Sequence, residues 1–336
     1  MGKRHRIIPI FIPHLGCPYQ CIYCDQRTIT AAAVPTPAEV ADFIERSLAT
    51  IPDHASVEVA FFGGNFTAIE HSQQESFLQV VQQWLPAGRV QGIRVSTRPD
   101  AINSSHLRWL QTYGVNCIEL GVQSLDESVL KLSGRGYNVG VVEHSAALIK
   151  QQGIQLGLQL MIGLPGDNRE KDLISTDLAI AMRPAMVRLY PTLVLEHTAL
   201  ATHYRLGHYQ AVSLDEAVST CCAMWRKFRA AGIPVIRMGL QSSEELKVMA
   251  GPWHPAFGEL VQQYDFWERA RFQLRNQTTL APVLRIGVHP QDISRMIGQH
   301  RSNIVRLETE FSCRLLVQGD ERLAPGSISV TAWDRE

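Results

Sequence analysis

The chain has 336 residues, 45% of them hydrophobic, and its 32 basic and 32 acidic residues leave no formal net charge. This length allows one large domain and a smaller one, with a substantial core. A neutral chain has no overall field that draws it onto nucleic acid or a membrane, so an RNA contact would need a local basic patch. No apolar run reaches the length of a membrane span, and we expect a cytoplasmic protein with no membrane partner.

Short apolar runs alternate with helical segments from about residue 6 to 240, which predicts repeated βα units on a parallel sheet. The expected strands span 7–12, 57–62, 93–98, 117–122, 156–163, 187–194 and 233–240. The expected helices include 38–51, 73–85 and 213–232. We therefore predict an α/β fold, a partial (open) TIM-like β/α barrel, with catalytic residues at the carboxyl ends of the strands.

The alternation breaks after residue 240. We expect a core barrel over 1–240, a connector with a helix over 241–280, and a small αβ unit over 281–336. The elements expected in the small unit are a strand at 283–288, a helix at 292–311, and strands at 313–318 and 327–330.

Three cysteines near the N-terminus carry the strongest chemical signal. Cys17, Cys21 and Cys24 have the spacing C-x-x-x-C-x-x-C. This spacing brings three thiolates into one small volume, which suits a soft metal or an iron–sulfur cluster better than a disulfide framework. A cluster of four irons with three protein ligands leaves one iron open to another molecule. The alternative is a structural zinc site that takes His14 as its fourth ligand.

Further motifs lie where later strands are expected to end. After 57–62 come Gly63 and Gly64, where missing side chains let the backbone approach a ligand. Ser96 offers a hydroxyl, and Arg98 offers a cationic fork that binds either a ligand anion or Asp100.

The next two expected strands end in polar and glycine-rich segments. Glu119, Gln123 and Arg135 lie around one strand end and the helix that follows it. An arginine there suits bidentate recognition of a carboxylate. Gly163 opens the turn 163–166 after the following strand.

The cysteine loop resembles that of the radical S-adenosylmethionine (SAM) enzymes, in which SAM chelates the open iron, accepts an electron and is cleaved to a 5′-deoxyadenosyl radical. The resemblance implies a [4Fe-4S] cluster on Cys17, Cys21 and Cys24, SAM as second cofactor, and an external one-electron reductant of the ferredoxin or flavodoxin type. The SAM contacts it implies are Tyr23 and Gly163 near the adenine, Gly63 and Gly64 at the amino group, Ser96 and Gln123 at the ribose, Arg135 at the carboxylate, and Arg98 as a further contact.

A closer resemblance covers about residues 6 to 240. The segments 96–100, 119–130, 134–137, 161–166 and 188–200 are similar, in the same order, to the radical SAM domain of the Elongator catalytic subunit. That subunit modifies the wobble uridine of tRNA, so the resemblance implies a radical SAM enzyme of tRNA modification with tRNA as partner.

Three departures from that family limit what is carried over. The Elongator subunit has a wider spacing between its first two cluster cysteines, and it has a glutamate where Ser96 stands here. It also carries an acetyltransferase domain after the barrel, for which residues 281–336 are too short. The acceptor of the radical therefore stays open.

The small C-terminal unit resembles a K-homology RNA-binding module, whose G-x-x-G loop clamps a nucleic-acid backbone. Here residues 298–301 read G-Q-H-R, so the second glycine is missing. The basic residues of this stretch are Arg285, Arg295, Arg301, Arg306, His289 and His300. They favour RNA binding, and the alternative is a small αβ cap with a solvated arginine face.

Two other functions remain open. Coproporphyrinogen dehydrogenase-like radical SAM enzymes share the GVQS-type and GLP-type motifs, but they have another cysteine two residues after the third, where Asp25 and Gln26 stand here. A non-catalytic RNA-binding protein stabilised by a metal is the other possibility. Outside the cofactor motifs, we expect Tyr190 to contact substrate because it lies at a strand end.

Overall fold

A computed structural model describes residues 5–17, 21–25, 33–240, 246–277 and 281–333. The chain forms two compact units. The first comprises Met1–Ala217 and Met224–Trp253, and the second comprises Val218–Ala223 and His254–Glu336. None of the helices in the described ranges is both long enough and apolar enough to cross a bilayer.

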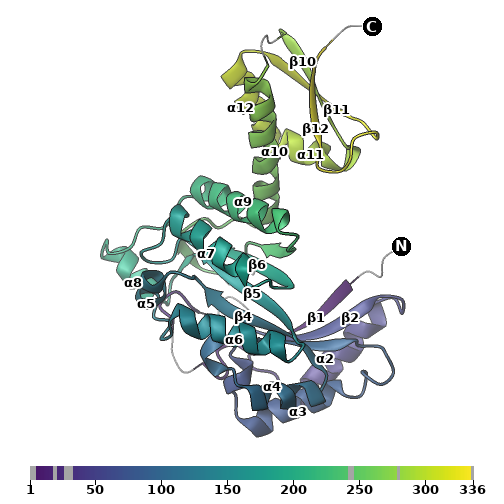
Figure 1. Ribbon diagram of the computed structural model, residues 1–336, viewed down its shortest axis with the longest axis vertical. Coiled ribbons are helices and arrows are strands. Elements are labelled where there is room, and N and C mark those ends of the chain that lie inside the picture. Colours follow the sequence, from purple (N-terminus) through teal and green to yellow (C-terminus); the bar gives the residue numbers. More distant parts are fainter. Residues whose placement is uncertain (1–4, 18–20, 26–32, 241–245, 278–280, 334–336) are drawn as a thin grey trace. The chain divides into compact units, whose positions relative to one another are not determined.

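The first unit is built on a sheet of seven parallel strands in the order β1-β2-β3-β4-β5-β6-β8 (Figure 1). The strands are β1 (His5–Phe11), β2 (Ser56–Phe62), β3 (Gly92–Thr97), β4 (Val115–Gln123), β5 (Gln155–Ile162), β6 (Met186–Pro191) and β8 (Val235–Met238). Within the described residues β1 and β8 are the two edges and do not pair, so the barrel is open. The predicted partial TIM-like barrel is confirmed.

Helices lie between successive strands and along the outer side of the sheet (Figure 1). They are α2 (Pro37–Thr50), α3 (His71–Val81), α4 (Ser104–Thr112), α5 (Glu127–Leu132), α6 (Val139–Gln151), α7 (Arg169–Ala181), α8 (Ala199–Arg205) and α9 (Leu214–Ala230). Two of them begin at capping boxes, formed by Thr36 with Glu39 and by Ser213 with Glu216. Each box satisfies backbone N–H groups that the first turn leaves unpaired.

The expected strand 187–194 is divided in two. β6 ends at Pro191, and the chain then forms β7 (Val194–Leu195), which pairs antiparallel with β9 (Val248–Ala250). Proline has no N–H with which to extend a ladder, and this favours the end of the strand there.

Alternate residues of each barrel strand face two different surroundings. On β4, Ile118 and Leu120 are fully buried toward the helices, whereas Glu119 and Gly121 line a cavity on the inner face. Gly157 pairs with Glu119 on the next strand, and a Cβ at Gly157 would lie 2.8 Å from Cγ of Glu119. The glycine therefore leaves room for a charged side chain inside the barrel.

The second unit has a three-stranded sheet in the order β11-β10-β12, with β10 parallel to β11 and antiparallel to β12. Its elements are α10 (Phe257–Arg275), β10 (Val283–Val288), α11 (Ile293–Ile297), α12 (Ser302–Phe311), β11 (Arg314–Gly319) and β12 (Ile328–Ala332). Phe266 and Leu274 of α10 share a core cluster with Ile286 and Leu307. This helix, which falls in the segment expected as a connector, thus contributes to the core of the small unit.

The helix expected over 292–311 is broken in the structure. Gly298 has φ 78°, and His300 and Arg301 are also left-handed, with φ 50° and 61°. A Cβ at Gly298 would lie 2.7 Å from Oγ of Ser302 and 3.0 Å from the backbone N of Asn303, so glycine is required there. Left-handed residues cannot continue a right-handed helix, and the segment becomes α11, a short turn and α12.

Candidate active site

A cavity of about 440 Å³ lies at the carboxyl ends of the barrel strands. The three cysteines line it together with most of the predicted SAM contacts, namely Tyr23, Gly63, Gly64, Ser96, Arg98, Gln123 and Arg135. These residues come from five separate segments of the sequence. The fold therefore assembles nearly all the predicted site residues around one space.

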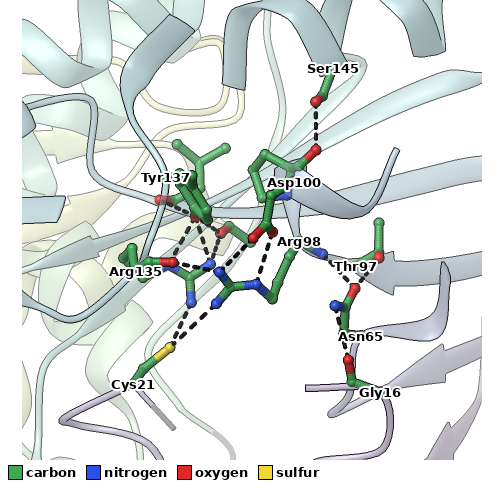
Figure 2. Close-up of polar contacts among 12 residues, drawn as sticks. Gly16, Cys21, Asn65, Thr97, Arg98, Asp100, Arg135, Tyr137 and Ser145 are labelled. Carbon is green, nitrogen blue, oxygen red and sulfur yellow. Dashed lines mark hydrogen bonds and ion pairs between the residues drawn. The ribbon is translucent and has the colours of Figure 1, made fainter. Parts of the chain in front are cut away.

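The cysteine loop rests on the segment that follows β2. Asn65 donates from Nδ2 to the carbonyl of Gly16 at 3.1 Å (Figure 2), and its backbone N donates to Leu15 at 2.8 Å. A Cβ on Gly64 would lie 2.7 Å from the carbonyl oxygens of Ile12 and Leu15. Gly64 thus has a packing role that the sequence did not indicate, because it lets the loop backbone approach β2 closely.

The three cysteines are free thiols at the cavity wall. Burial, and next the neighbouring Cys21, raise the pKa of Cys17. Burial, and next the other two thiols, raise the pKa of Cys24. Thiolates at these positions therefore need a cationic partner, which iron or another metal supplies.

The cysteine thiols are the candidate metal donors of this cavity. Within the described ranges, no group of three or more histidine, cysteine, aspartate or glutamate side chains is close enough together to hold one metal ion. Three soft thiol donors that line one cavity suit an iron–sulfur cluster.

Arg135 lies beside Cys21 at the centre of a polar network (Figure 2). Its Nη1 donates to Sγ of Cys21 at 3.0 Å and to Oη of Tyr23 at 3.3 Å. Its Nε and Nη2 donate to Oη of Tyr137 at 2.9 and 2.6 Å, and Nη2 also donates to the carbonyl of Gly121. The network holds a buried positive charge against a predicted cluster ligand.

Arg98 is committed largely to protein partners. Its Nε and Nη2 bind the two carboxylate oxygens of Asp100, each at 2.9 Å, and Nη2 also donates to the carbonyl of Arg135 (Figure 2). Its Nη1 is 3.9 Å from Sγ of Cys21. Of the two partners considered from the sequence, the structure pairs Arg98 with Asp100.

Gly163 is the predicted site residue that does not line the cavity. It has φ 76°, and a Cβ there would lie 2.8 Å from Cγ2 of Val212. Its carbonyl accepts a hydrogen bond from Oη of Tyr209 at 2.6 Å. The positive φ and the close approach of Val212 are structural reasons for a glycine at this position.

The barrel contains a cluster of charged side chains, of which the sequence analysis identified only Glu119. Arg94 on β3 binds Glu58 on β2 at 2.6 Å and Glu119 on β4 at 2.7 Å. Arg188 on β6 binds Glu119 at 2.7 Å. Two arginines and two glutamates thus balance in charge. The available signal was a charged residue within each of the four strands β2, β3, β4 and β6, which is unusual for strands covered on both faces.

Asn65 and Tyr137 were also missed, although both lie next to motifs that were recognised. Asn65 accepts hydrogen bonds through Oδ1 from Oγ1 of Thr97 at 2.5 Å and from the backbone N of Arg98 at 3.1 Å (Figure 2). Asn65 therefore ties the cysteine loop to the end of β3, and Tyr137 orients Arg135. Neither role is visible without the tertiary structure.

Two family models match the chain. The radical SAM superfamily matches residues 11–176, and the radical SAM C-terminal domain matches residues 184–265. Together they span the barrel and the start of the second unit.

Individual relatives point the same way. The tRNA uridine(34) acetyltransferase of Dehalococcoides mccartyi is 29% identical over 241 residues, which cover 60% of this chain and 52% of that protein. Elongator complex protein 3 of Mus musculus is 31% identical over 215 residues, covering 55% of this chain and 39% of that protein. The chain thus spans about half or less of the length of these relatives.

A solved structure resembles the fold. The archaeal Elp3 of Methanocaldococcus infernus, with an N-terminal deletion, matches with a TM-score of 0.62 at 21% identity, over 80% of this chain and 64% of that one. At 21% identity, this similarity supports the fold alone.

Proposed function

Because the chain belongs to the radical SAM superfamily, we propose that Cys17, Cys21 and Cys24 hold a [4Fe-4S] cluster and that the cavity beside them binds SAM. Once bound, these cofactors supply a 5′-deoxyadenosyl radical, formed by one-electron cleavage of SAM, for hydrogen abstraction from a substrate. The observation that carries the proposal is the convergence of three thiols and Arg135 on one cavity at the carboxyl ends of the strands.

The side chains of this cavity suit the parts of SAM. Arg135 offers a guanidinium to the SAM carboxylate, and Tyr137 and Gly121 hold that guanidinium in position before a ligand arrives. This preorganisation reduces the ordering cost of binding. Ser96 and Gln123 are assigned to the ribose hydroxyls, and the backbone at Gly63 to the amino group.

Anaerobic reconstitution with iron and sulfide tests the proposal. We expect a [4Fe-4S] spectrum and, with SAM and dithionite, release of 5′-deoxyadenosine. A Cys21→Ala variant is expected to lose both. Stoichiometric zinc with no SAM cleavage would contradict the proposal. In the cell, a cytoplasmic ferredoxin or flavodoxin would supply the electron.

We propose further that the substrate is tRNA, at the wobble uridine. Similarity to a tRNA uridine(34) acetyltransferase supports this assignment, and so do His300 and Arg301, which are exposed at the loop of the small unit. Two other basic side chains of that unit have internal partners: Arg295 binds Asp292 at 2.6 Å, and Arg306 lies 4.3 Å from the ring centroid of Trp267.

Comparing the modified nucleosides of total tRNA with and without the gene tests the tRNA assignment. We expect loss of a modification at the wobble uridine, restored by the unsubstituted gene and not by a Cys21→Ala gene. An unchanged nucleoside profile would contradict tRNA as the substrate while leaving SAM cleavage untouched.

A further inference from the structure

The cavity continues beyond the cysteine side toward β6 and β8. Arg188 and Arg237 are register partners on these neighbouring parallel strands, so their side chains leave the same face of the sheet. Both line the cavity, together with Tyr190 and Gln159. Both guanidinium groups therefore belong to this part of the cavity lining.

The two arginines differ in their partners. Arg188 donates from Nε and Nη2 to the two carboxylate oxygens of Glu119, at 2.7 and 3.2 Å. Arg237 is half-buried, and its Nε donates to the carbonyl of Gly239 at 3.1 Å. Across the described residues, no acceptor contacts the two terminal nitrogens of Arg237.

The other cavity arginines have acidic partners. Arg188 shares Glu119 with Arg94, which lies outside the cavity lining and also binds Glu58. Arg98 is matched by Asp100. If the proposed function holds, Arg135 is matched by the SAM carboxylate.

Arg237 is then the cavity arginine without a counter-charge in the described part of the chain. A partly desolvated cation with no counter-ion is costly. A cavity that keeps one is suited to an anionic ligand, for which the arginine fork is the best-matched side chain.

We propose that Arg237, with Arg188 and the hydroxyl of Tyr190, forms a subsite for an oxyanion, a carboxylate or phosphate group of the substrate. The Tyr190 hydroxyl is 3.4 Å from Nη1 of Arg188, so it can donate to the same ligand oxygen. The ring of Phe62 lies 5.0 Å from the Arg188 guanidinium carbon, and Phe11 is 6.4 Å from Phe62 between ring centroids. This aromatic wall suits an apolar or planar body attached to the anionic group.

The subsite deepens the proposed function because it sets the orientation of the substrate. An anionic group held on β6 and β8 leaves the rest of the molecule to extend across the cavity toward the cysteine side. The choice of hydrogen to be abstracted then depends on the distance from the anionic group to the reacting carbon.

Isothermal titration calorimetry tests the subsite directly. Inorganic phosphate and acetate are titrated separately into the cluster-loaded chain, with saturating SAM, no reductant, and chloride to hold ionic strength constant. We expect saturable binding of at least one of them, and the preferred probe tells whether the subsite takes a phosphate or a carboxylate. Arg237→Gln is expected to weaken binding about tenfold or more, and Arg237→Lys to keep part of the affinity.

The matched control is Arg46→Gln, which removes a surface arginine paired with Asp42 at 2.9 Å and is expected to leave binding unchanged. The thermal unfolding midpoint of each variant, measured without ligand, shows whether the variant is folded. If Arg237→Gln is unfolded, Arg237→Lys is used as the test variant. Absence of binding above chloride, or equal affinity in Arg237→Gln, would overturn the subsite.

The two proposals can fail separately. If the unsubstituted chain binds an oxyanion through Arg237 but does not cleave SAM, the proposed function is wrong and the subsite stands. If it cleaves SAM but the Arg237 variants bind phosphate and acetate as the unsubstituted chain does, the subsite is wrong and the proposed function stands.

Discussion

Nη1 of Arg135 lies 3.0 Å from Sγ of Cys21, although 114 residues separate the two along the chain. The contact joins the N-terminal cysteine loop to the segment that follows α5. It places a fixed cation where a cluster ligand and the SAM carboxylate are expected to meet, so we expect both cluster assembly and SAM affinity to depend on this part of the cavity.

Loss of a single cluster cysteine is expected to abolish the cluster. Cys24→Ala removes one of three proposed ligands, so iron and sulfide content after reconstitution is expected to fall to background. The matched control is Cys313→Ala, a buried thiol of the second unit, which is expected to retain full cluster content. Equal iron content in the two variants would show that Cys24 is not a ligand.

Removing the Arg135 guanidinium is expected to weaken SAM binding. Arg135→Gln removes the buried positive charge proposed to face the SAM carboxylate, and the dissociation constant for SAM is expected to rise by on the order of 10- to 100-fold. Tyr137→Phe keeps the charge but removes the hydroxyl that orients it, so a smaller rise is expected. Equilibrium dialysis of the cluster-loaded protein without reductant gives both constants, with iron content as the control. Unchanged SAM affinity in Arg135→Gln would exclude this role.

The buried ion cluster is expected to make Glu119 important for stability. Glu119→Gln leaves Arg94 and Arg188 short of a counter-charge, and the free energy of unfolding of the barrel is expected to fall by about 3 kcal/mol. Asp42→Asn breaks an exposed pair, in which the aspartate side chain is 63% exposed, and is expected to cost less than about 1 kcal/mol. Urea denaturation measures both. Similar losses of unfolding free energy in Glu119→Gln and Asp42→Asn would show that the buried ion cluster is no more important for stability than an exposed ion pair.

The free energy of unfolding is expected to fall as pH rises because Asp172 loses its proton. Burial, and next the charge of Asp167 beside it, raise the pKa of Asp172 well above its ordinary value. The folded chain therefore holds this proton at pH values where the unfolded chain has lost it. The contribution of this bound proton to the free energy of unfolding is fully present below the pKa of the unfolded chain, about 4. It is lost as pH rises through the pKa of the folded chain.

Comparison with Asp172→Asn isolates the effect. The asparagine cannot ionise, so the decline of unfolding free energy between pH 4.5 and 8 is expected to be shallower, by about 1.4 kcal/mol for each unit of pKa shift. Glu170→Gln, at an exposed position in the first turn of the same helix, is expected to follow the unsubstituted chain. Parallel curves for the unsubstituted chain and Asp172→Asn would contradict the raised pKa.

The strands and most of the candidate site could be predicted because they depend on short-range pattern. The spacing of Cys17, Cys21 and Cys24 is local, and apolar runs bounded by polar turns indicate buried strands whatever their partners. The prediction of one continuous helix over 292–311 was wrong. The apolar periodicity of the sequence continues through Gly298, but the left-handed backbone at residues 300 and 301 interrupts the helical hydrogen bonds.

The sequence by itself determined the class of fold, the three thiols and the strand ends that carry the cavity residues, since each follows from residue type and spacing along the chain. The tertiary structure alone decided the partners of those residues. It paired Arg98 with Asp100, balanced Arg94 and Arg188 with Glu58 and Glu119, and left Arg237 facing the cavity. The physical reason is that charge pairing acts over a few ångströms in space, and the register of neighbouring strands sets those distances.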